Sequence, residues 1–439
     1  MTETPAKTVP SAVWRLAAKQ DRRFRSGHPW VYSNELGASP KGVAPGAPVE
    51  LQDAGGKFLA WGYGNPASLI AFRALSRNPE EKDAVSAEGV LRRLRTASAL
   101  RQGLGLSHVS HRLIFGEADQ LPGLIVDRFA LATAKGAQVF VVQAHTAGMD
   151  RLVPELESVF EHFVPDGDWS RTAIVIKNDA GARKLEGLEI EAPRVARAIP
   201  GVDLGNAAIL IKSASGGAPL TFYTDLVEGQ KTGFFLDQSA NIELAVSRLL
   251  AGNEQAVRGS TLRVLDLCCY VGQWGAQLAA AGKKLGFKVE VVGVDASEKA
   301  LVFAKRNVEA QGAQFGAVRG DVLRDLSRFE DHSFDLVISD PPAFIKGRKD
   351  IPTGTHAYLQ LNTQVFRVVC DSGAVICCSC SGLMEEHSFH ETLGKAARRL
   401  DRKVQWIARG GQGPDHPILS EFSEGQYLKC WLGLVSQSF

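Results

Sequence analysis

Short apolar runs alternate with helical patterns along the C-terminal half of the chain. The runs are RVLDL, VEVVGVD, FGAVRGD, FDLVISD and AVICCS, and the stretches between them, such as SEKALVFAKRNVEAQG, repeat apolar residues at helical spacing. Strands that are apolar along their whole length are typical of a parallel sheet covered by helices on both faces. The pattern therefore predicts an α/β domain over residues 201–439, built on a doubly wound, Rossmann-like sheet.

Two further domains are predicted before residue 201. Residues 12–84 hold short strands and turns, including the hairpin pattern VELQDAGGKFLAWGYG around Gly55 and Gly56, and are expected to form a small β-rich module. Residues 85–200 combine a helix through LRRLRTASALR, the strands QVFVVQAH and TAIVIKND, and a helical pattern in MDRLVPELESVFEHF. They are expected to form a central α/β domain.

The composition is that of a water-soluble globular protein, with 45% apolar and 22% charged residues. No apolar run is long enough to span a membrane, so no membrane partner is expected. The seven cysteines are unevenly spaced. They indicate reduced thiols in the cytoplasm rather than a disulfide framework.

Basic residues cluster although the net charge is only +2. Arg22, Arg23 and Arg25 lie in the N-terminal module, and a second group of arginines lies in LRRLRTASALR. Such clusters can neutralise RNA phosphates, which makes the first group a candidate RNA contact. A solvated basic surface explains either cluster equally well.

Acidic residues recur at the ends of the predicted strands. Asp266, Asp295, Asp321 and Asp340 follow one another in this way, and Asp295 stands 20 positions after Gly275. In open α/β sheets the ligand lies beyond these strand ends, and an acid at that spacing can bind a ribose diol. Asp321 could reach an adenine amino group. Helix capping by each Asp is the alternative, but the ordered series favours a nucleoside cofactor.

The turn CCYVGQWG, which contains Cys268 and Gly272, lacks both the dinucleotide-binding and the phosphate-loop patterns. A nucleoside without phosphates fits such a turn, and S-adenosylmethionine is the common one. The upstream segment EGQKTGFFLDQS offers Lys231, Phe235 and Gln238 to its methionine end or its ring. No metal is expected, because no Cys or His set has zinc-ligand spacing.

The segment DPPAF, Asp340 to Phe344, suits a planar base. Pro341 and Pro342 force extended backbone and offer carbonyl acceptors without N–H donors. These acceptors and the Asp340 carboxylate suit an exocyclic amine, and Phe344 is available to stack. A proline-stiffened loop without a ligand is the alternative.

Three cysteines lie within the next strand, in AVICCSC. Cys377 and Cys378 are expected to fill the core, as are Cys370 and Cys430. Cys380 lies nearest the carboxyl end of the strand, facing the same site as Asp340. It is predicted to be a nucleophile.

Several of these motifs together resemble a known family. KTGFFLDQ, CCYVG, DPPAF, CSCSGLM and DHPILSEFSEGQYLK, with GHPWVYS and GEADQLPGLIVDRF nearer the N-terminus, are similar to the ribosomal RNA large subunit methyltransferase I family over nearly the whole chain. The resemblance implies an N-terminal PUA domain, a central linking domain, a class I S-adenosylmethionine domain, 5-methylcytosine as the product in large-subunit ribosomal RNA, and a possible homodimer. The chain departs from the family at Ser239, where Arg is common, and at Ala343, where Lys is frequent.

The chemistry of cytosine explains why a cysteine belongs in such a site. Carbon 5 is a poor nucleophile until a thiolate adds to carbon 6, and Asp340 can hold N3 and the amino group of the adduct. Two other functions remain open. One is methylation of a base nitrogen at Asp340-Pro341-Pro342 with Cys380 as a structural residue, and the other is RNA binding by a protein whose catalytic domain is vestigial. A small-molecule methyltransferase would leave the PUA-like module unexplained.

Overall fold

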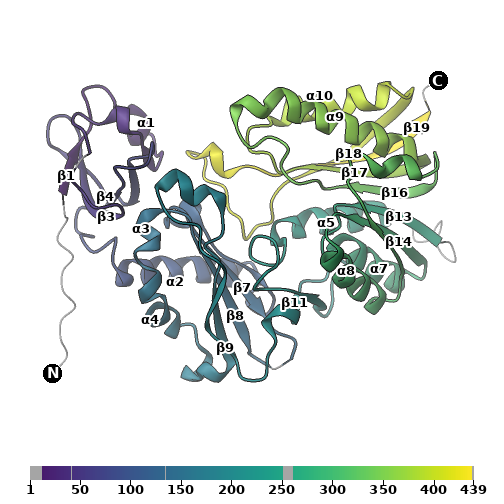
Figure 1. Ribbon diagram of the computed structural model, residues 1–439, viewed down its shortest axis with the longest axis horizontal. Helices are drawn as coiled ribbons and strands as arrows, with labels where there is room; N and C mark the ends of the chain where they lie inside the picture. Colours follow the sequence, from purple (N-terminus) through teal and green to yellow (C-terminus); the bar gives the residue numbers. More distant parts are fainter. Residues whose placement is uncertain (1–11, 41, 134, 251–260, 438–439) are drawn as a thin grey trace. The chain divides into compact units, whose positions relative to one another are not determined.

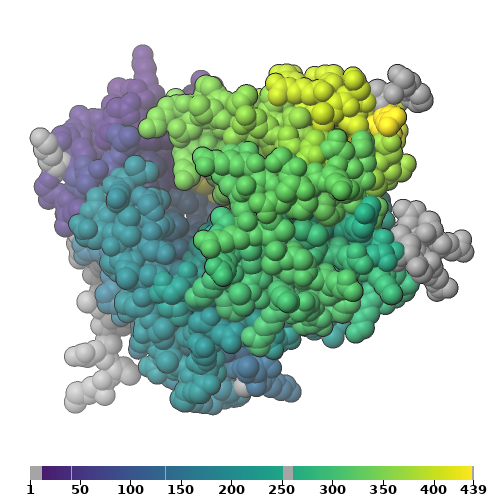
Figure 2. Space-filling view, turned by 45° about the vertical axis from the view of Figure 1, so that its right-hand side comes forward, coloured from purple at the N-terminus to yellow at the C-terminus, as the bar shows by residue number. Residues whose placement is uncertain are grey.

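The computed structural model describes residues 12–40, 42–133, 135–250 and 261–437. The chain divides into two compact units. The N-terminal unit comprises the residues up to Ile209 together with Asp225–Phe235 and Asp415–Gly425, and the C-terminal unit comprises Leu210–Thr224, Leu236–Pro414 and the residues from Gln426 onward. Figure 1 shows the elements of both units, and Figure 2 shows the surface of the C-terminal unit, most of it in green to yellow.

The first sheet of the N-terminal unit confirms the predicted hairpin, because β3 and β4 pair antiparallel around Gly55 and Gly56. Its five strands lie in the order β1-β3-β4-β5-β2, with β1 parallel to β3. The short helix α1 (Arg22–Arg25) follows β1. The strand bounds are β1 (Ala12–Arg15), β2 (Trp30–Val31), β3 (Ala47–Gln52), β4 (Phe58–Gly64) and β5 (Phe72–Ser76).

A second five-stranded sheet has the order β10-β9-β8-β7-β6. Its strands are β6 (His111–Phe115), β7 (Leu124–Ala130), β8 (Gln138–Ala144), β9 (Thr172–Ile176) and β10 (Arg194–Arg197). The helix predicted through the second arginine group is α2 (Ala87–Gly103). The helix predicted in MDRLVPELESVFEHF is instead broken into α3 (Ala147–Asp150) and α4 (Leu156–Glu161), because Pro154 between them has no N–H to continue the helical ladder.

The two sheets of the N-terminal unit share one hydrophobic core. Leu94 of α2 and Phe140 of β8 are buried in the same cluster as Trp61 and Tyr63 of β4. The Tyr63 hydroxyl donates a hydrogen bond to the carbonyl of Pro122 at 2.6 Å. Burial of large aromatic rings from both sheets therefore stabilises this unit as a single body.

Two segments from later in the chain are anchored in the N-terminal unit by polar contacts. Asp415 accepts a hydrogen bond from the Arg112 amide at 2.8 Å, and its carbonyl accepts one from Arg101 at 2.7 Å. The buried Arg101 guanidinium also pairs with Asp119. In the other segment, the Thr232 hydroxyl donates to Asp127 at 2.5 Å. These contacts fix Asp225–Phe235 and Asp415–Gly425 within this unit.

The C-terminal unit is built on a seven-stranded sheet in the order β15-β14-β13-β16-β17-β19-β18. The first five strands in this order are mutually parallel, whereas β19 runs antiparallel to both β17 and β18. The strands are β13 (Thr261–Leu267), β14 (Lys288–Asp295), β15 (Gln314–Arg319), β16 (Phe334–Ser339), β17 (Val369–Ser379), β18 (Arg402–Gly410) and β19 (Lys429–Gln437). This is the doubly wound, Rossmann-like sheet that the sequence predicts, with the antiparallel strand β19 in addition.

Helices cover both faces of this sheet (Figure 1), with α9 and α10 on one face and α7 and α8 on the other. They are α5 (Ser239–Ala245), which continues as a π-helical turn over Val246–Leu250, α7 (Gln273–Leu285), α8 (Glu298–Ala310), α9 (Ile351–Val368) and α10 (Glu386–Arg398). The central strands β13, β16 and β17 are buried as predicted, but β15 is largely exposed because it forms the edge of the sheet. β11 (Ala207–Ile211) and β12 (Leu220–Thr224) form a separate two-stranded sheet.

None of the helices that the structure describes has the length and apolar character needed to cross a membrane.

Gly148 in α3 lies at a position where any larger residue should destabilise the fold. A Cβ atom there would lie 2.2 Å from Cγ of the buried Tyr63 ring. Gly148→Ala should therefore lower the free energy of unfolding by about 1–3 kcal/mol through overpacking, seen as a lower thermal unfolding midpoint. Gly103→Ala is the matched control, since its Cβ would meet nothing within 4 Å. Equal midpoints for Gly148→Ala and the wild type would contradict the packing described.

Candidate active site

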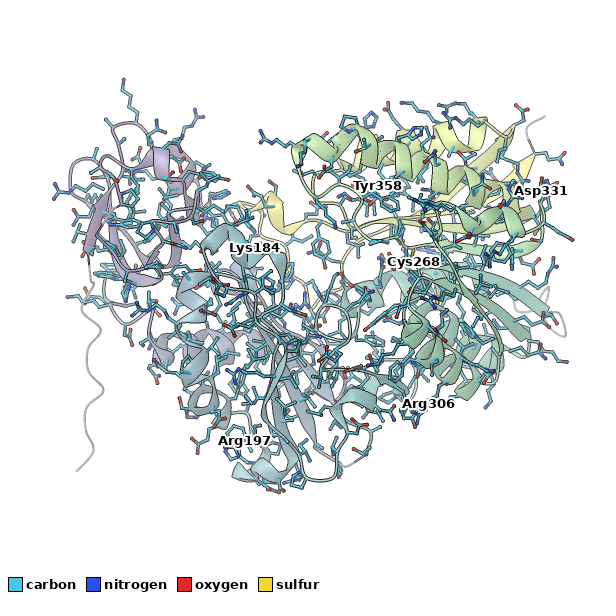
Figure 3. All side chains as sticks on the ribbon, in the orientation of Figure 1. Lys184, Arg197, Cys268, Arg306, Asp331 and Tyr358 are labelled. Atoms are coloured by element: carbon cyan, nitrogen blue, oxygen red, sulfur yellow. The ribbon has the colours of Figure 1, made fainter. Side chains whose placement is uncertain are left out.

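The carboxyl ends of three neighbouring strands bring the candidate residues together. β13, β16 and β17 are parallel, and Leu267, Ser339 and Cys377 are register partners. Asp340 and Cys380 therefore follow adjacent strands at the same edge of the sheet. In Figure 3, Cys268 after β13 and Asp331 before β16 mark opposite ends of this sheet.

The turn between β13 and α7 passes close to α8. Cys268, Tyr270 and Gly272 all have positive φ angles, of 60°, 48° and 75°. A Cβ atom on Gly272 would lie 3.0 Å from the Cα atom of Ala304 in α8. The turn thus needs a glycine at this position, and the amide of its left-handed Tyr270 points at Asp295 at the end of β14.

Asp266, inside β13, is a buried carboxyl without a compensating partner. It is fully buried, and neither oxygen accepts a hydrogen bond of normal geometry from the residues described. Burial, and to a smaller extent the negative charges of Asp340 and Asp295, raise the pKa of Asp266 to about 8, although the Gly275 amide acts in the opposite direction. An orphaned acceptor at this edge fits a bound group that carries hydrogen-bond donors, such as the amino group of a methionine moiety.

Asp295, at the end of β14, already binds two backbone amides. Its carboxylate accepts hydrogen bonds from the Tyr270 amide at 2.9 Å and the Ser297 amide at 2.8 Å. Each oxygen keeps a second lone pair, so the same carboxylate could still accept a ribose hydroxyl. The structure therefore combines the capping role and the predicted ligand position in one residue.

Asp321, after β15, is exposed and caps a turn. Its carboxylate accepts a hydrogen bond from the Leu323 amide at 2.9 Å and lies 3.5 Å from the Arg324 guanidinium. These contacts match the alternative of local capping that the sequence left open. Its contact with an adenine amino group stays a prediction.

Asp340 is oriented by a neighbouring indole. The Trp274 Nε1–H group donates to Asp340 at 3.3 Å. The Asp340 charge also contributes to raising the pKa of Asp266 and that of Cys268, whose thiol is shifted mainly by burial. The two carboxyl groups therefore lie near each other, and a low pH or a bound cation relieves their repulsion.

Cys380 and the DPPAF segment contact each other directly. The Cys380 thiol donates to the Pro341 carbonyl at an Sγ–O distance of 3.6 Å. Pro341 is buried and Pro342 is exposed. Phe344 is half-buried and packs on Tyr358, with ring centroids 4.8 Å apart. Phe344 therefore serves the core of this unit, and its stacking on a base stays a prediction.

Three residues around Cys380 were missed by sequence reasoning. The Ser381 hydroxyl lies 2.9 Å from the Tyr358 hydroxyl, on α9 (labelled in Figure 3), and accepts from the Ile345 amide at 3.1 Å. Lys429, the first residue of β19, donates its Nζ to the Ser381 carbonyl at 2.7 Å. Only a lysine at the start of an apolar strand, in YLKCWLGLV, could have signalled this arrangement.

The three upstream candidates fall in different units. Lys231 and Phe235 belong to the N-terminal unit, where the Lys231 ammonium lies 4.5 Å from the centre of the Phe235 ring. Gln238 belongs to the C-terminal unit, is buried, and accepts a hydrogen bond from Asn241 at 2.6 Å. Their contacts with a cofactor stay predictions.

Acidic residues pair with most of the arginines in both basic clusters. Arg23 pairs with Glu35 at 2.9 Å, and Arg25 pairs with both Asp21 and Asp53. Arg22 is exposed and has no ion-pair partner in the described part of the chain. In α2, three of the arginines pair with acids, namely Arg92, Arg93 and Arg101.

Three of the remaining cysteines are core residues, whereas the Cys370 thiol donates to the Asp335 carboxylate at 3.5 Å, which corrects the expectation that Cys370 fills the core. Cys377, Cys378 and Cys430 are buried, as predicted for core residues, and Cys370 is half-buried. No group of three potential metal ligands was found within residues 12–40, 42–133, 135–250 and 261–437.

Two family models match the chain. A PUA-like domain matches residues 15–77, and a methyltransferase domain matches residues 264–352. A solved structure from Streptococcus mutans, described as a SAM-dependent methyltransferase, covers 96% of this chain and 100% of its own with a TM-score of 0.71 at 15% identity. The fold and the matched domain define a class I methyltransferase.

Curated relatives identify the family. Ribosomal RNA large subunit methyltransferase I of Erwinia tasmaniensis is 32% identical over 94% of this chain and 97% of its own. The protein of the same name from Serratia proteamaculans is also 32% identical, and that from Escherichia coli is 30% identical, each over 94% of this chain and 97% of its own. The chain belongs to the ribosomal RNA large subunit methyltransferase I family, which confirms the resemblance found in the sequence.

The raised pKa of Asp266 predicts a pH-dependent stability. Between about pH 4 and about pH 8 the folded protein keeps the Asp266 proton that the unfolded chain releases, so stability falls as the pH rises through this range. Asp266→Asn removes this pH-dependent loss of folding stability, which amounts to about a few kcal/mol at most. The fall in thermal midpoint from about pH 5 to about pH 8, without cofactor, should therefore be smaller in the variant than in the wild type. Asp401→Asn, at an exposed carboxyl, should leave the fall unchanged.

Proposed function

We propose that this protein methylates carbon 5 of a cytosine in large-subunit ribosomal RNA, with Cys380 as the nucleophile. The observation that carries the proposal is the contact between the Cys380 thiol and the Pro341 carbonyl, 3.6 Å apart. It joins a thiol to the Asp340-Pro341-Pro342 segment at the ends of adjacent parallel strands. The family relatives are named for ribosomal RNA methylation, which supports the substrate class.

Each residue has a chemical role in this proposal. The Cys380 thiolate adds to carbon 6 of the cytosine, which makes carbon 5 an enamine nucleophile. The Asp340 carboxyl group and the carbonyls of the loop bind N3 and the exocyclic amine, so they hold the ring over the thiol. After methylation, loss of the carbon 5 proton to water or to Asp340 allows elimination of the Cys380 thiolate. The target base must first leave its stack, at a cost of a few kcal/mol.

The cofactor would be held by the turn and strand ends described above. When bound, S-adenosylmethionine supplies a methyl group on a positively charged sulfonium. Gly272 lets the turn pack closely against α8, Asp295 would accept from a ribose hydroxyl, and Asp266 would accept from a donor that relieves its orphaned carboxyl. Burial raises the pKa of the Cys268 thiol well above the ordinary range, so the thiol stays protonated. Cys268 therefore contributes through its left-handed backbone and not through a thiolate.

The PUA-like domain is proposed to hold the RNA strand. Arg22 is its most available phosphate contact, because Arg23 and Arg25 are engaged with acidic residues of the same unit. Exposed cations near the target loop, Lys346, Arg348 and Lys349, would compensate for Ala343.

Cys380→Ala should abolish the formation of 5-methylcytidine. The expected result is loss of labelled product to background, because carbon 5 is not activated without the thiolate. The measurement is methyl transfer from labelled S-adenosylmethionine to ribosomal RNA, followed by nucleoside digestion. Cys378→Ala, at a buried core cysteine two residues away, should retain the activity.

RNA that carries 5-fluorocytidine separates the proposed mechanism from its rival. The thiol route leaves a stable covalent complex with the wild type and none with Cys380→Ala. A labelled product methylated on a base nitrogen, formed equally well by Cys380→Ala, would overturn the proposal.

Arg22→Ala should weaken RNA binding uniformly across sequences. Loss of one phosphate contact lowers the slope of log affinity against log salt by about 0.7–0.9. The measurement is RNA binding across a salt series. Arg92→Ala is the matched control, because Arg92 already pairs with Glu81 and Asp83 at 3.0 and 2.8 Å and should leave the slope unchanged.

A further inference from the structure

Lys429 lies beside Cys380 because of the register of two strands. It pairs with Ser379 across the antiparallel β17–β19 ladder. Its side chain is turned inward, and the residue is only 7% exposed. The ammonium donates to the Ser381 carbonyl at 2.7 Å and to the Tyr427 carbonyl at 3.0 Å. Lys429 is thus anchored directly on the peptide that follows Cys380.

This buried ammonium has no acidic partner in contact. In the part of the chain that the structure describes, no carboxylate lies within ion-pair distance of Lys429. Glu386 on α10 acts on it from farther away, but Glu386 pairs with Arg409 at 3.3 Å. A buried cation that is satisfied only by neutral carbonyls is costly, and it needs a functional reason.

The electrostatics of Lys429 point to the thiol. Burial lowers the pKa of Lys429 to about 8, whereas the Cys380 sulfur, as a thiolate, and Glu386 raise it. A Cys380 thiolate stabilises the charged form of Lys429. By reciprocity, the charged form of Lys429 stabilises the Cys380 thiolate to the same extent.

The neighbouring Pro341 carbonyl, Asp340 carboxyl group and Tyr358 hydroxyl bring no positive charge to the Cys380 sulfur. The Pro341 carbonyl accepts from the thiol, and the Asp340 carboxyl group that precedes it is acidic. The Tyr358 hydroxyl on α9 is engaged with Ser381. Lys429 of β19 supplies a positive charge that acts on the Cys380 sulfur, and its ammonium is held 2.7 Å from the carbonyl of Ser381, the next residue.

We infer that Lys429 is a positioning residue that holds Cys380 as the reactive thiolate, through the charge of its ammonium anchored on the Ser381 carbonyl. The inference rests on the proposed role of Cys380 as nucleophile. Lys429 does not touch the base. It raises the fraction of Cys380 that is competent to add to carbon 6 at neutral pH.

The test is the pH dependence of alkylation of Cys380 by iodoacetamide, followed by mass spectrometry of its peptide in the full-length protein. Lys429→Gln keeps a donor for the carbonyls but removes the charge, and it should raise the midpoint of the alkylation profile by about one pH unit or more. Lys429→Arg keeps the charge and should restore a midpoint close to that of the wild type. Lys395→Gln, at an exposed lysine of α10, should leave it unchanged.

Formation of 5-methylcytidine gives the second readout. At neutral pH, Lys429→Gln should lower its rate about tenfold, with recovery at higher pH as the thiol ionises. An unchanged alkylation midpoint in Lys429→Gln would overturn the inference. If Lys429→Gln does not fold, Lys429→Met is judged by the same criterion. Full activity of Cys380→Ala would instead defeat the proposed nucleophile, whatever the alkylation profile shows.

Discussion

The parallel register of β13, β16 and β17 is the constraint on which the candidate site depends. Because these strands end together, Asp340 and Cys380 follow adjacent strands, and the thiol lies 3.6 Å from the Pro341 carbonyl. A slip by one residue in β17 would turn Cys380 toward the other face of the sheet. The antiparallel strand β19 adds the constraint from the other side, since its pairing with β17 carries Lys429 to the peptide after Cys380.

Two buried ionisable groups, one acidic and one basic, lie at this edge and have different partners. Asp266 is buried without a hydrogen-bond partner of normal geometry among the described residues, and burial favours its neutral form. Lys429 is buried but anchored on two carbonyls, so it can keep a charge at physiological pH. Unsatisfied or costly groups of this kind occur where a ligand or a reaction uses them. Their shared location supports a cofactor site and a nucleophile at one edge of the sheet.

Arginine has two roles in this chain that composition alone does not distinguish. The LRRLRTASALR cluster forms most of a helix whose guanidinium groups pair with Glu81, Asp83 and Asp119. Arg22 instead lies exposed on a short helix of the first sheet's domain. In both segments most arginines pair with acids, several of them brought from distant positions by folding, and the basic sequence alone does not show which arginine keeps no acidic partner.

The sequence by itself determined the α/β class, the succession of the five parallel strands β13–β17, and the family, because apolar periodicity and local motifs are encoded within short segments. It also placed Asp340 and Cys380 at strand ends. Only the tertiary structure decided that β19 inserts antiparallel beside β17, that Phe344 packs on Tyr358, and that Lys429 lies beside Cys380. These features depend on pairing between segments far apart in the chain, and such long-range contacts leave no periodic signal in the residues that make them.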